Sequence, residues 1–194
     1  DGHRISIRRV QLKDHYEDEK VIVPGKTLTE ISKILSGEAD REVLIYFTAN
    51  HILFEFDDTV VVSRLIEGQY FNVNQMLSND YETRITLNKQ ELLDSIERSV
   101  LLIRESDKKP IIITITDMGM EIAIQSAIGS LKEEILIHKE GKDITIGFNP
   151  KFLIDALRVI DDENVDLYMV NSKAPCFIRD GEGNYIYLIL PVNI

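Results

Sequence analysis

The feature that most constrains the fold of this chain is a pattern that occurs three times: a short strand, an amphipathic helix and three further strands. The helix of the first copy follows Pro24, a residue typical of helix starts, and its apolar residues recur at helical spacing. The second and third copies begin near Asn88 and Asn149, at intervals of about 60 residues, and such self-similarity indicates an internal repeat.

The repeat predicts an α+β fold in which each helix buries one apolar face. Asn149 followed by Pro150 is typical of an N-cap and a first helical position. The helix residues that we expect in the core are Leu28, Ile31, Ile34, Leu35, Leu92, Leu93, Ile96, Val100, Phe152, Leu153, Ala156 and Leu157. The predicted strands are residues 21–23, 43–47, 52–56, 60–65, 83–87, 111–116, 120–126, 133–138, 144–148, 165–170, 176–179 and 185–190.

A unit of this length buries too little apolar surface to be stable on its own, so we expect pairs of units to merge their sheets into one domain. The second and third copies make a complete pair, roughly residues 79–194. The first copy lacks its mate, and residues 1–20 read as the tail of that missing partner. We therefore expect the chain to be a piece of a longer one, with residues 67–80 as a connector between domains.

Charge and composition narrow the function classes. The net charge of -11 argues against a protein that holds nucleic acid by broad phosphate neutralisation, although it leaves room for a local basic face. Cys176 is the single cysteine, so it cannot form an internal disulfide, which suits the cytoplasm. The longest apolar runs fall short of the roughly 20 residues that cross a bilayer, and no secretion signal is expected.

Five segments, taken in order, resemble the bacterial sliding clamp, the beta subunit of DNA polymerase III. They are "DGHRISIRR", "VIVPGKTLTEISKIL", "ITLNKQELLDSIERSVLLIRES", "ITIGFNPKFLIDALRVID" and "YLILPV", and the resemblance covers nearly the whole chain. It implies a DNA-clamp fold with antiparallel sheets outside and helices on the inner face. Residues 1–72 would be the carboxy-terminal part of the middle domain, and residues 73–194 the whole final domain.

The resemblance also implies a non-catalytic DNA polymerase processivity factor. Such a clamp closes head to tail as a homodimer ring around duplex DNA and needs no cofactor. It tethers polymerase, clamp-loader and repair proteins, raising their effective concentration at the template. Topological linkage does not require tight phosphate binding, so a clamp can be acidic.

The apolar carboxy-terminal run of residues 184–194 fits this resemblance as one wall of a cleft for linear peptide motifs. An extended peptide would place apolar side chains in the cleft, with His3 and Arg4 as polar edges. The alternative is that Leu188 and Leu190 simply fill the core by strand alternation. The cleft residues implied by the resemblance are Gly2, His3, Arg4, Ile5, Met76, Pro175, Leu188, Ile189, Leu190, Pro191 and Val192.

The chain departs from the family pattern at the rim of this cleft. Phe71 and Asn72 stand where a proline and an aspartate are usual, and Gln75 and Asn193 stand where arginines are common. These differences should reshape the rim and change the affinity for the usual motifs.

Two further surfaces are implied. The candidates to face DNA, whose alternative is an ordinary solvated helix charge, are Lys26, Lys33, Lys89, Arg98, Lys151 and Arg158. Leu102 and Ile103 follow the second helix, where the family contacts the neighbouring subunit; the alternative is that both are core residues at a helix end.

The sequence gives little support for metal binding, phosphate binding or catalysis. His3, His15, His51 and His138 show no metal-ligand spacing, and Asp161 to Glu163 are more typical of a solvated turn than of a metal site. No phosphate-binding loop or nucleophile elbow is present. The competing interpretation is an enzyme or small-molecule-binding domain on a repeated α+β sandwich, with "DGHR" as its polar site.

Overall fold

A computed structural model describes residues 1–35, 42–103 and 109–194. The chain divides into two compact units, one of Asp1–Gln11 with Asn79–Ile194 and the other of Leu12–Ser78. The first eleven residues thus pack with the third and second copies of the repeat rather than with the segment that follows them in the sequence.

The larger unit contains the two complete copies of the repeat. The elements of the first are β5 (Thr83–Asn88), α2 (Lys89–Val100), β6 (Ile111–Thr116), β7 (Gly119–Ser126) and β8 (Gly129–Ile135). The short strand β9 (His138–Gly141) follows. The elements of the second are β10 (Ile144–Phe148), α3 (Pro150–Leu157), β11 (Asn164–Met169), β12 (Cys176–Arg179) and β13 (Tyr185–Ile189). Each copy therefore repeats the predicted order of strand, helix and three strands.

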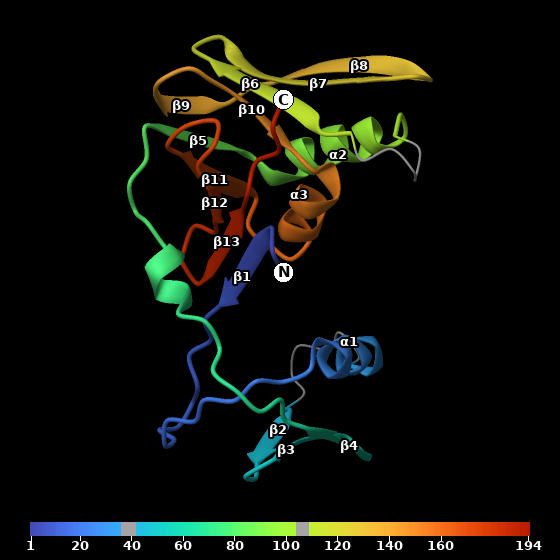
Figure 1. Ribbon diagram of the computed structural model, residues 1–194, viewed down its shortest axis with the longest axis vertical. Helices are drawn as coiled ribbons and strands as arrows, with labels where there is room; N and C mark the ends of the chain where they lie inside the picture. Colours follow the sequence, from blue (N-terminus) through green and yellow to red (C-terminus); the bar gives the residue numbers. More distant parts are fainter. Residues whose placement is uncertain (36–41, 104–108) are drawn as a thin grey trace. The chain divides into compact units, whose positions relative to one another are not determined.

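The two copies exchange their first strands. β5 pairs antiparallel with β11 of the other copy, and β10 pairs antiparallel with β6. The resulting sheets have the orders β1-β13-β12-β11-β5-β9 and β10-β6-β7-β8, where β1 is Arg4–Arg8. Figure 1 shows α2 and α3 next to each other on the same side of this unit. The prediction that paired copies merge into one domain is confirmed.

One core serves both copies. Leu92 and Ile96 of α2 and Leu153 and Leu157 of α3 are fully buried in the same apolar cluster. Asn88 and Asn149 cap the two helices alike, because their side chains accept the backbone N–H groups of Glu91 and Lys151 at 3.0 and 3.1 Å. The predicted core face is correct for these helices, except that Val100 and Phe152 are only partly buried at its margin.

The third strand of the first complete copy lies earlier than predicted. The expected bounds of 133–138 are wrong, since β8 spans Gly129–Ile135. It pairs with β7 in a register that runs from Ser126 opposite Gly129 to Met120 opposite Ile135. The turn between them is closed by the Ser126 hydroxyl, which accepts the backbone N–H of Ile128 at 3.2 Å. Strand β9, which pairs with β5, was not predicted at all.

The smaller unit contains α1 (Gly25–Ile34), β2 (Leu44–Phe47), β3 (His51–Phe56), β4 (Thr59–Arg64) and the 3-10 helix η1 (Val73–Met76). The three strands form an antiparallel sheet in the order β2-β3-β4. Its core consists of Ile31, Ile52, Phe54 and Phe56. The expected strand at residues 21–23 is not formed; instead the Ile22 carbonyl accepts one isolated backbone hydrogen bond, from Ile66 at 2.9 Å, which is too little for a ladder.

The helix of the smaller unit buries less than its pattern predicts. Ile31 is buried, but Leu28, Ile34 and Leu35 are 49%, 52% and 38% exposed. In the described part of this unit, the sheet has three strands and there is no second α-helix to pack against α1 as α3 packs against α2 in the larger unit. Within the described residues there is therefore too little apolar surface to cover that face of α1.

Candidate peptide-binding site

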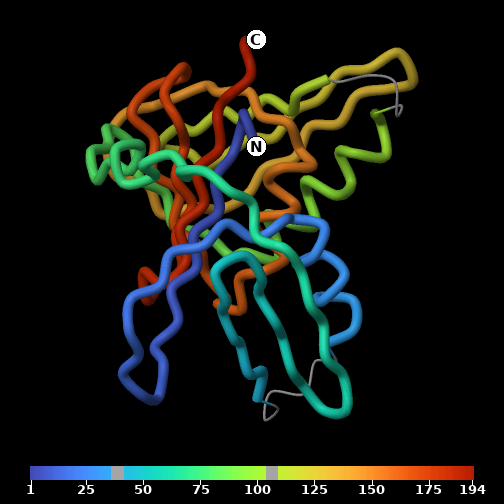
Figure 2. Tube along the Cα trace, turned by 60° about the horizontal axis from the view of Figure 1, so that its bottom comes forward, coloured from blue at the N-terminus to red at the C-terminus, as the bar shows by residue number. Residues whose placement is uncertain are grey.

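Strand β1 brings the amino-terminal "DGHR" segment beside the carboxy-terminal run. β1 is antiparallel to β13, with Arg4 opposite Ile189 and Ile5 opposite Leu188. The backbone N–H of Leu190 then donates to the carbonyl of His3 at 2.9 Å. Figure 2 shows the blue amino-terminal segment alongside the red carboxy-terminal one. Residues nearly the whole chain apart thus share one edge of a sheet.

The candidate residues divide between the two faces of this sheet. Ile189 joins Tyr185 and Tyr187 in the main core, so it is a packing residue. Leu188 points to the opposite face together with its cross-strand neighbours Ile5 and Phe177. Leu188 is thus buried without contributing to the main core cluster, and the choice between a core role and a cleft role stays open for it.

Arg4 is the centre of a polar cluster at one end of this edge. Its guanidinium donates to Asp155 of α3 at 2.5 Å, to Asp1 at 3.0 Å and to the Tyr187 hydroxyl at 3.2 Å. It also lies over the ring of Phe152, 4.3 Å from the ring centroid. Burial opposes the charged form, but the hydrogen bonds that Arg4 donates to Asp155 and Tyr187 outweigh it and raise the pKa of Arg4.

Three residues of this cluster were not predicted as site residues. Phe152 was assigned to the helix core, yet its ring is half-buried and lies 6.1 Å from the exposed ring of His3. Asp155 and Tyr187 carried no signal in the sequence, because their partner Arg4 is about as far away along the chain as a residue can be. Only a register for β1 against β13 would have revealed them.

The tail after β13 leaves one sheet for the other. Leu190 bonds to His3, but two residues later the backbone N–H of Val192 donates to the carbonyl of Gly147 in β10 at 2.8 Å. Figure 1 shows this last segment running from β13 toward β10. Pro191 lies between the two bonds, and a proline cannot donate to a ladder, which suits the change of partner. Leu190 and Pro191 are half-buried, and Val192 is 38% exposed.

The remaining candidates are divided between the two units. Pro175 is half-buried and directly precedes β12, the strand next to β13. Gly2 is exposed beside His3. Met76 ends η1 in the smaller unit and is 45% exposed. Phe71, one of the departures from the family pattern, is exposed and stacks on Tyr70 with ring centroids 4.6 Å apart.

The six residues that are candidates to face DNA differ in their ion-pair and hydrogen-bond partners. Arg98 forms a bidentate pair with Glu133, with bonds of 2.7 and 2.6 Å, and Arg158 donates to Glu97 at 2.8 Å. Lys33 pairs with Glu30 at 2.9 Å, and Lys89 donates to the Ile160 carbonyl at 3.0 Å. Lys26 and Lys151 are exposed, and neither makes an ion pair with any residue that the structure describes.

Leu102 and Ile103 lie in the turn that follows α2. Both are half-buried and pack against the main core, while the preceding Leu101 is 77% exposed. Leu102 also packs at the start of β8, where a methyl group added to Gly129 would lie 3.4 Å from its Cδ2 atom. These residues thus share the features of a core margin and of an apolar surface beside a sheet edge.

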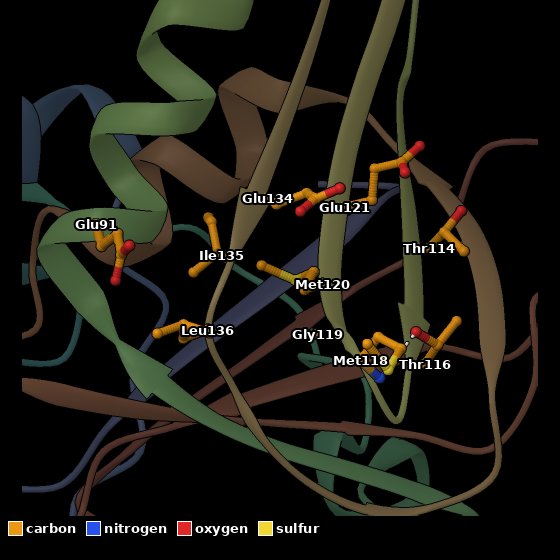
Figure 3. A pocket seen from close by; sticks show the side chains of 10 residues that line it. All are labelled: Glu91, Thr114, Thr116, Met118, Gly119, Met120, Glu121, Glu134, Ile135 and Leu136. Atoms are coloured by element: carbon orange, nitrogen blue, oxygen red, sulfur yellow. Dashed lines mark hydrogen bonds between the residues drawn. The ribbon is translucent and has the colours of Figure 1, made fainter.

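A separate hollow of about 470 Å³ lies at the turn between β6 and β7. Figure 3 shows the exposed Met118 and Leu136 there, with the carboxylates of Glu91, Glu121 and Glu134 around them. None of the predicted site residues lines it.

Residues 1–35, 42–103 and 109–194 show neither a metal-binding cluster nor a membrane-spanning helix. In this part of the chain, no three His, Cys, Asp or Glu side chains gather in a way that could hold a metal ion. None of its helices has the length and apolar character required to span a membrane.

Comparison with known proteins gives a consistent result. Residues 74–193 match the family described as DNA polymerase III beta subunit, C-terminal domain, and residues 1–72 match its central domain. The chain is 33% identical to the beta sliding clamps of Staphylococcus aureus and Staphylococcus epidermidis, over its full length and 52% of theirs. It therefore spans about half the length of these relatives.

Solved structures agree with this match. A crystal structure from Eubacterium rectale, assigned to the DNA polymerase III beta subunits, is 66% identical, with a TM-score of 0.96 over the whole chain and 53% of that protein. The DNA polymerase sliding clamp of Bacillus subtilis is 32% identical, with a TM-score of 0.92 over the whole chain and 52% of that protein.

Proposed function

Because this chain belongs to the DNA polymerase III beta subunit family, we propose that it is part of a sliding clamp, a non-catalytic processivity factor that encircles duplex DNA. The observation that carries this proposal is the duplication in the larger unit, in which two matched copies exchange strands and set their helices side by side. In this proposal residues 1–72 belong to the middle domain and residues 73–194 form the final domain. The role also implies a cytoplasmic location.

The proposed partners of the cleft are polymerase, clamp-loader and repair proteins that carry short linear motifs. The half-buried Ile5 and Leu190 side chains offer apolar surface beside a strand edge, and His3 and Phe152 offer an aromatic rim. An extended peptide with apolar anchors suits such a site. The altered rim at Phe71, Gln75 and Asn193 should change the preference among motifs.

A peptide titration tests the cleft. A fluorescently labelled peptide with a polymerase clamp-binding motif should bind the chain and raise its melting temperature. Met76→Ala and Leu190→Ser should weaken binding by about tenfold each, the effect of losing one well-packed apolar contact. Val159→Ser, at an exposed apolar position beyond α3, is the matched control and should bind as the parent does. Equal binding by all variants would contradict the assigned cleft.

The proposed contact with DNA is weak and independent of sequence. Lys26 and Lys151 are exposed and available to phosphates, whereas Lys33, Arg98 and Arg158 would first have to leave carboxylate partners. The full-length protein that carries this chain should load onto nicked circular DNA and be lost after linearisation. Retention on linear DNA would contradict topological tethering.

The proposed subunit interface is the edge of β8 together with Leu102 and Ile103. The internal duplication supports this assignment, because β13, the counterpart of β8 in the other copy, receives β1 on its outer edge. β8 is the last strand of its sheet among the described residues. An antiparallel strand from the neighbouring subunit of a full-length homodimer would complete it.

A substitution at the centre of β8 tests the interface. Lys132→Pro in the full-length protein would remove a backbone donor from the proposed edge, because Lys132 forms a non-hydrogen-bonded pair with Ala123 of β7, and should shift the dimer toward monomer in analytical ultracentrifugation. Ser6→Pro in β1, whose strand is engaged within the chain, is the control and should leave the dimer intact. A Lys132→Pro protein that remains folded and fully dimeric would argue against this edge.

A further inference from the structure

Residue 147, near the end of β10, is a glycine, but its backbone conformation does not require one. It does not have the positive φ angle that favours glycine, unlike Gly119 and Gly141. Its counterpart in the other copy is Thr86, two residues before the N-cap Asn88 as Gly147 is two before Asn149. Thr86 carries a side chain at the same place in an equivalent strand, so the strand itself tolerates one.

What differs between the two positions is the carboxy-terminal tail. A Cβ atom added to Gly147 would collide with Cγ2 of Ile194 and would lie 3.0 Å from the carbonyl oxygen of Val192. The Val192 N–H group donates to the Gly147 carbonyl at 2.8 Å, and the two residues form an isolated antiparallel bridge. The tail therefore lies directly on the bare backbone of Gly147.

We call this contact of Val192 and Ile194 with Gly147 the seat of the tail. Together with the bond between Leu190 and His3, it holds both ends of the segment that forms one wall of the proposed cleft. At one end Leu190 is bonded to His3, and at the other Val192 is bonded to Gly147, with Pro191 between them. Three residues held between two different sheets have little freedom, and a preformed wall costs a bound peptide little ordering entropy. Without the second bond, residues 191–194 would lose their backbone anchor on β10.

We infer that Gly147 is a positioning residue for peptide binding: the absence of a side chain there seats residues 191–194 and so shapes the cleft wall. This inference rests on the proposed function of the cleft. Gly147 itself need not touch the peptide, because it acts through the tail.

Two variants of graded size test the inference. Gly147→Ala asks the tail to shift by a few tenths of an ångström and the Ile194 side chain to turn away, whereas Gly147→Val displaces the tail further. We expect the affinity for the labelled peptide to fall by roughly threefold and roughly tenfold respectively, in line with moderate overpacking. Thr145→Val, two residues earlier on the exposed side of β10, is the matched control and should bind as the parent does. Gly147→Ala remains informative if the valine variant does not fold.

Hydrogen exchange of the Val192 amide, measured by NMR, tests the contact with Gly147 without any peptide. The Val192 amide should lose protection in both Gly147 variants, while the Leu190 amide, bonded to His3, keeps it. Ile194→Ala combined with Gly147→Ala should restore part of both the protection and the affinity, because the larger collision is removed.

The outcomes separate this inference from the proposed function. Unchanged Val192 protection in both variants would overturn the seat. Lost protection with unchanged peptide affinity would show that the seat does not shape the cleft, and would overturn the inference while leaving the clamp proposal intact. If the parent chain binds no clamp-motif peptide, the cleft proposal fails and the positioning role fails with it, whatever the exchange data show of the seat.

Discussion

At the scale of single residues, the Arg4 side chain connects two segments that lie far apart in the sequence. It joins β1 to α3 through Asp155 and to β13 through Tyr187, and it covers the ring of Phe152. Arg4→Ala should lower the free energy of unfolding by about 1 kcal/mol, because half-exposed Asp155 is screened by solvent and the pair is worth less than a buried one. Urea unfolding followed by circular dichroism measures this difference.

Arg158→Ala is the matched control for Arg4. Arg158 pairs with Glu97 in the same unit, but its side chain is 61% exposed. Its removal should change the free energy of unfolding by no more than about 0.5 kcal/mol. Equal losses in the two variants would mean that the Arg4 cluster adds nothing beyond an ordinary surface pair.

A second prediction at the scale of single residues concerns Asp166 and the dependence of folding stability on pH. Burial raises the pKa of this carboxyl, but hydrogen bonds from Thr86, Arg84 and Tyr168 outweigh burial, and the net pKa is lowered. A lowered pKa stabilises the fold above the unfolded value of about 3.9, and that stability is lost as the pH falls through the folded pKa. The stability difference between the parent and Asp166→Asn should therefore shrink below about pH 4. A difference that stays constant from pH 6 to pH 3 would contradict this assignment.

Single residues also show where sequence reasoning stops. His3, Arg4 and Leu188 to Val192 were identifiable because they lie in two short segments that resemble a known family. The partners of Arg4 and the seat at Gly147 were not, because each depends on contacts between segments far apart in the chain. Such contacts follow from strand register, which one sequence does not reveal.

At the scale of elements, the exchanged strands β5 and β10 tie the two copies into one cooperative unit. Ile85 of β5 and Ile146 of β10 are fully buried in the same cluster. Either residue changed to alanine should cost about 2–5 kcal/mol, the usual range for a fully buried isoleucine. Because β10 pairs with β6, Ile146→Ala should speed amide exchange in β6 and β7 as well as in β11. Faster exchange confined to residues 144–194 would show that the copies open separately.

The helix caps give a milder test at the same scale. Asn149→Ala leaves the first turn of α3 without its side-chain acceptor and should cost about 1 kcal/mol. Asn164→Ala, at an exposed strand position, is the control and should cost less. Chemical denaturation compares the two variants directly, and equal stabilities would mean that Pro150 alone fixes the start of the helix.

Elements were predicted best where local chemistry decides them. The helix starts at Asn88 and Asn149 follow from capping residues close in sequence, and both were correct. β8 was misplaced because its start depends on a tight turn after Ser126, whereas the apolar pattern of residues 133–138 suggested a later strand. The segment 21–23 has strand-forming residues but forms no ladder, since β propensity needs a neighbouring strand to be expressed.

At the scale of the whole molecule, the two compact units differ sharply in how much core they possess. The larger unit buries a continuous cluster drawn from both copies of the repeat, whereas among its described residues the smaller unit has a core of Ile31, Ile52, Phe54 and Phe56. A small core leaves a marginal balance against chain entropy. The repeat count in the sequence anticipated this inequality, since one copy out of three stood without a mate.

We therefore expect the two units to open at different free energies. Backbone amides of β2, β3 and β4 should exchange before those of β6, β7 and β11 under native conditions, because fewer buried side chains hold them. Phe54→Ala should accelerate exchange in the smaller unit by an amount equivalent to about 3–5 kcal/mol, up to that unit's own stability, and leave β11 unchanged. Ile113→Ala, at a fully buried position in β6, should do the converse. If Phe54→Ala also accelerates β11, or if all these strands exchange together in the parent, the units unfold as one and their separate cores do not set their stability.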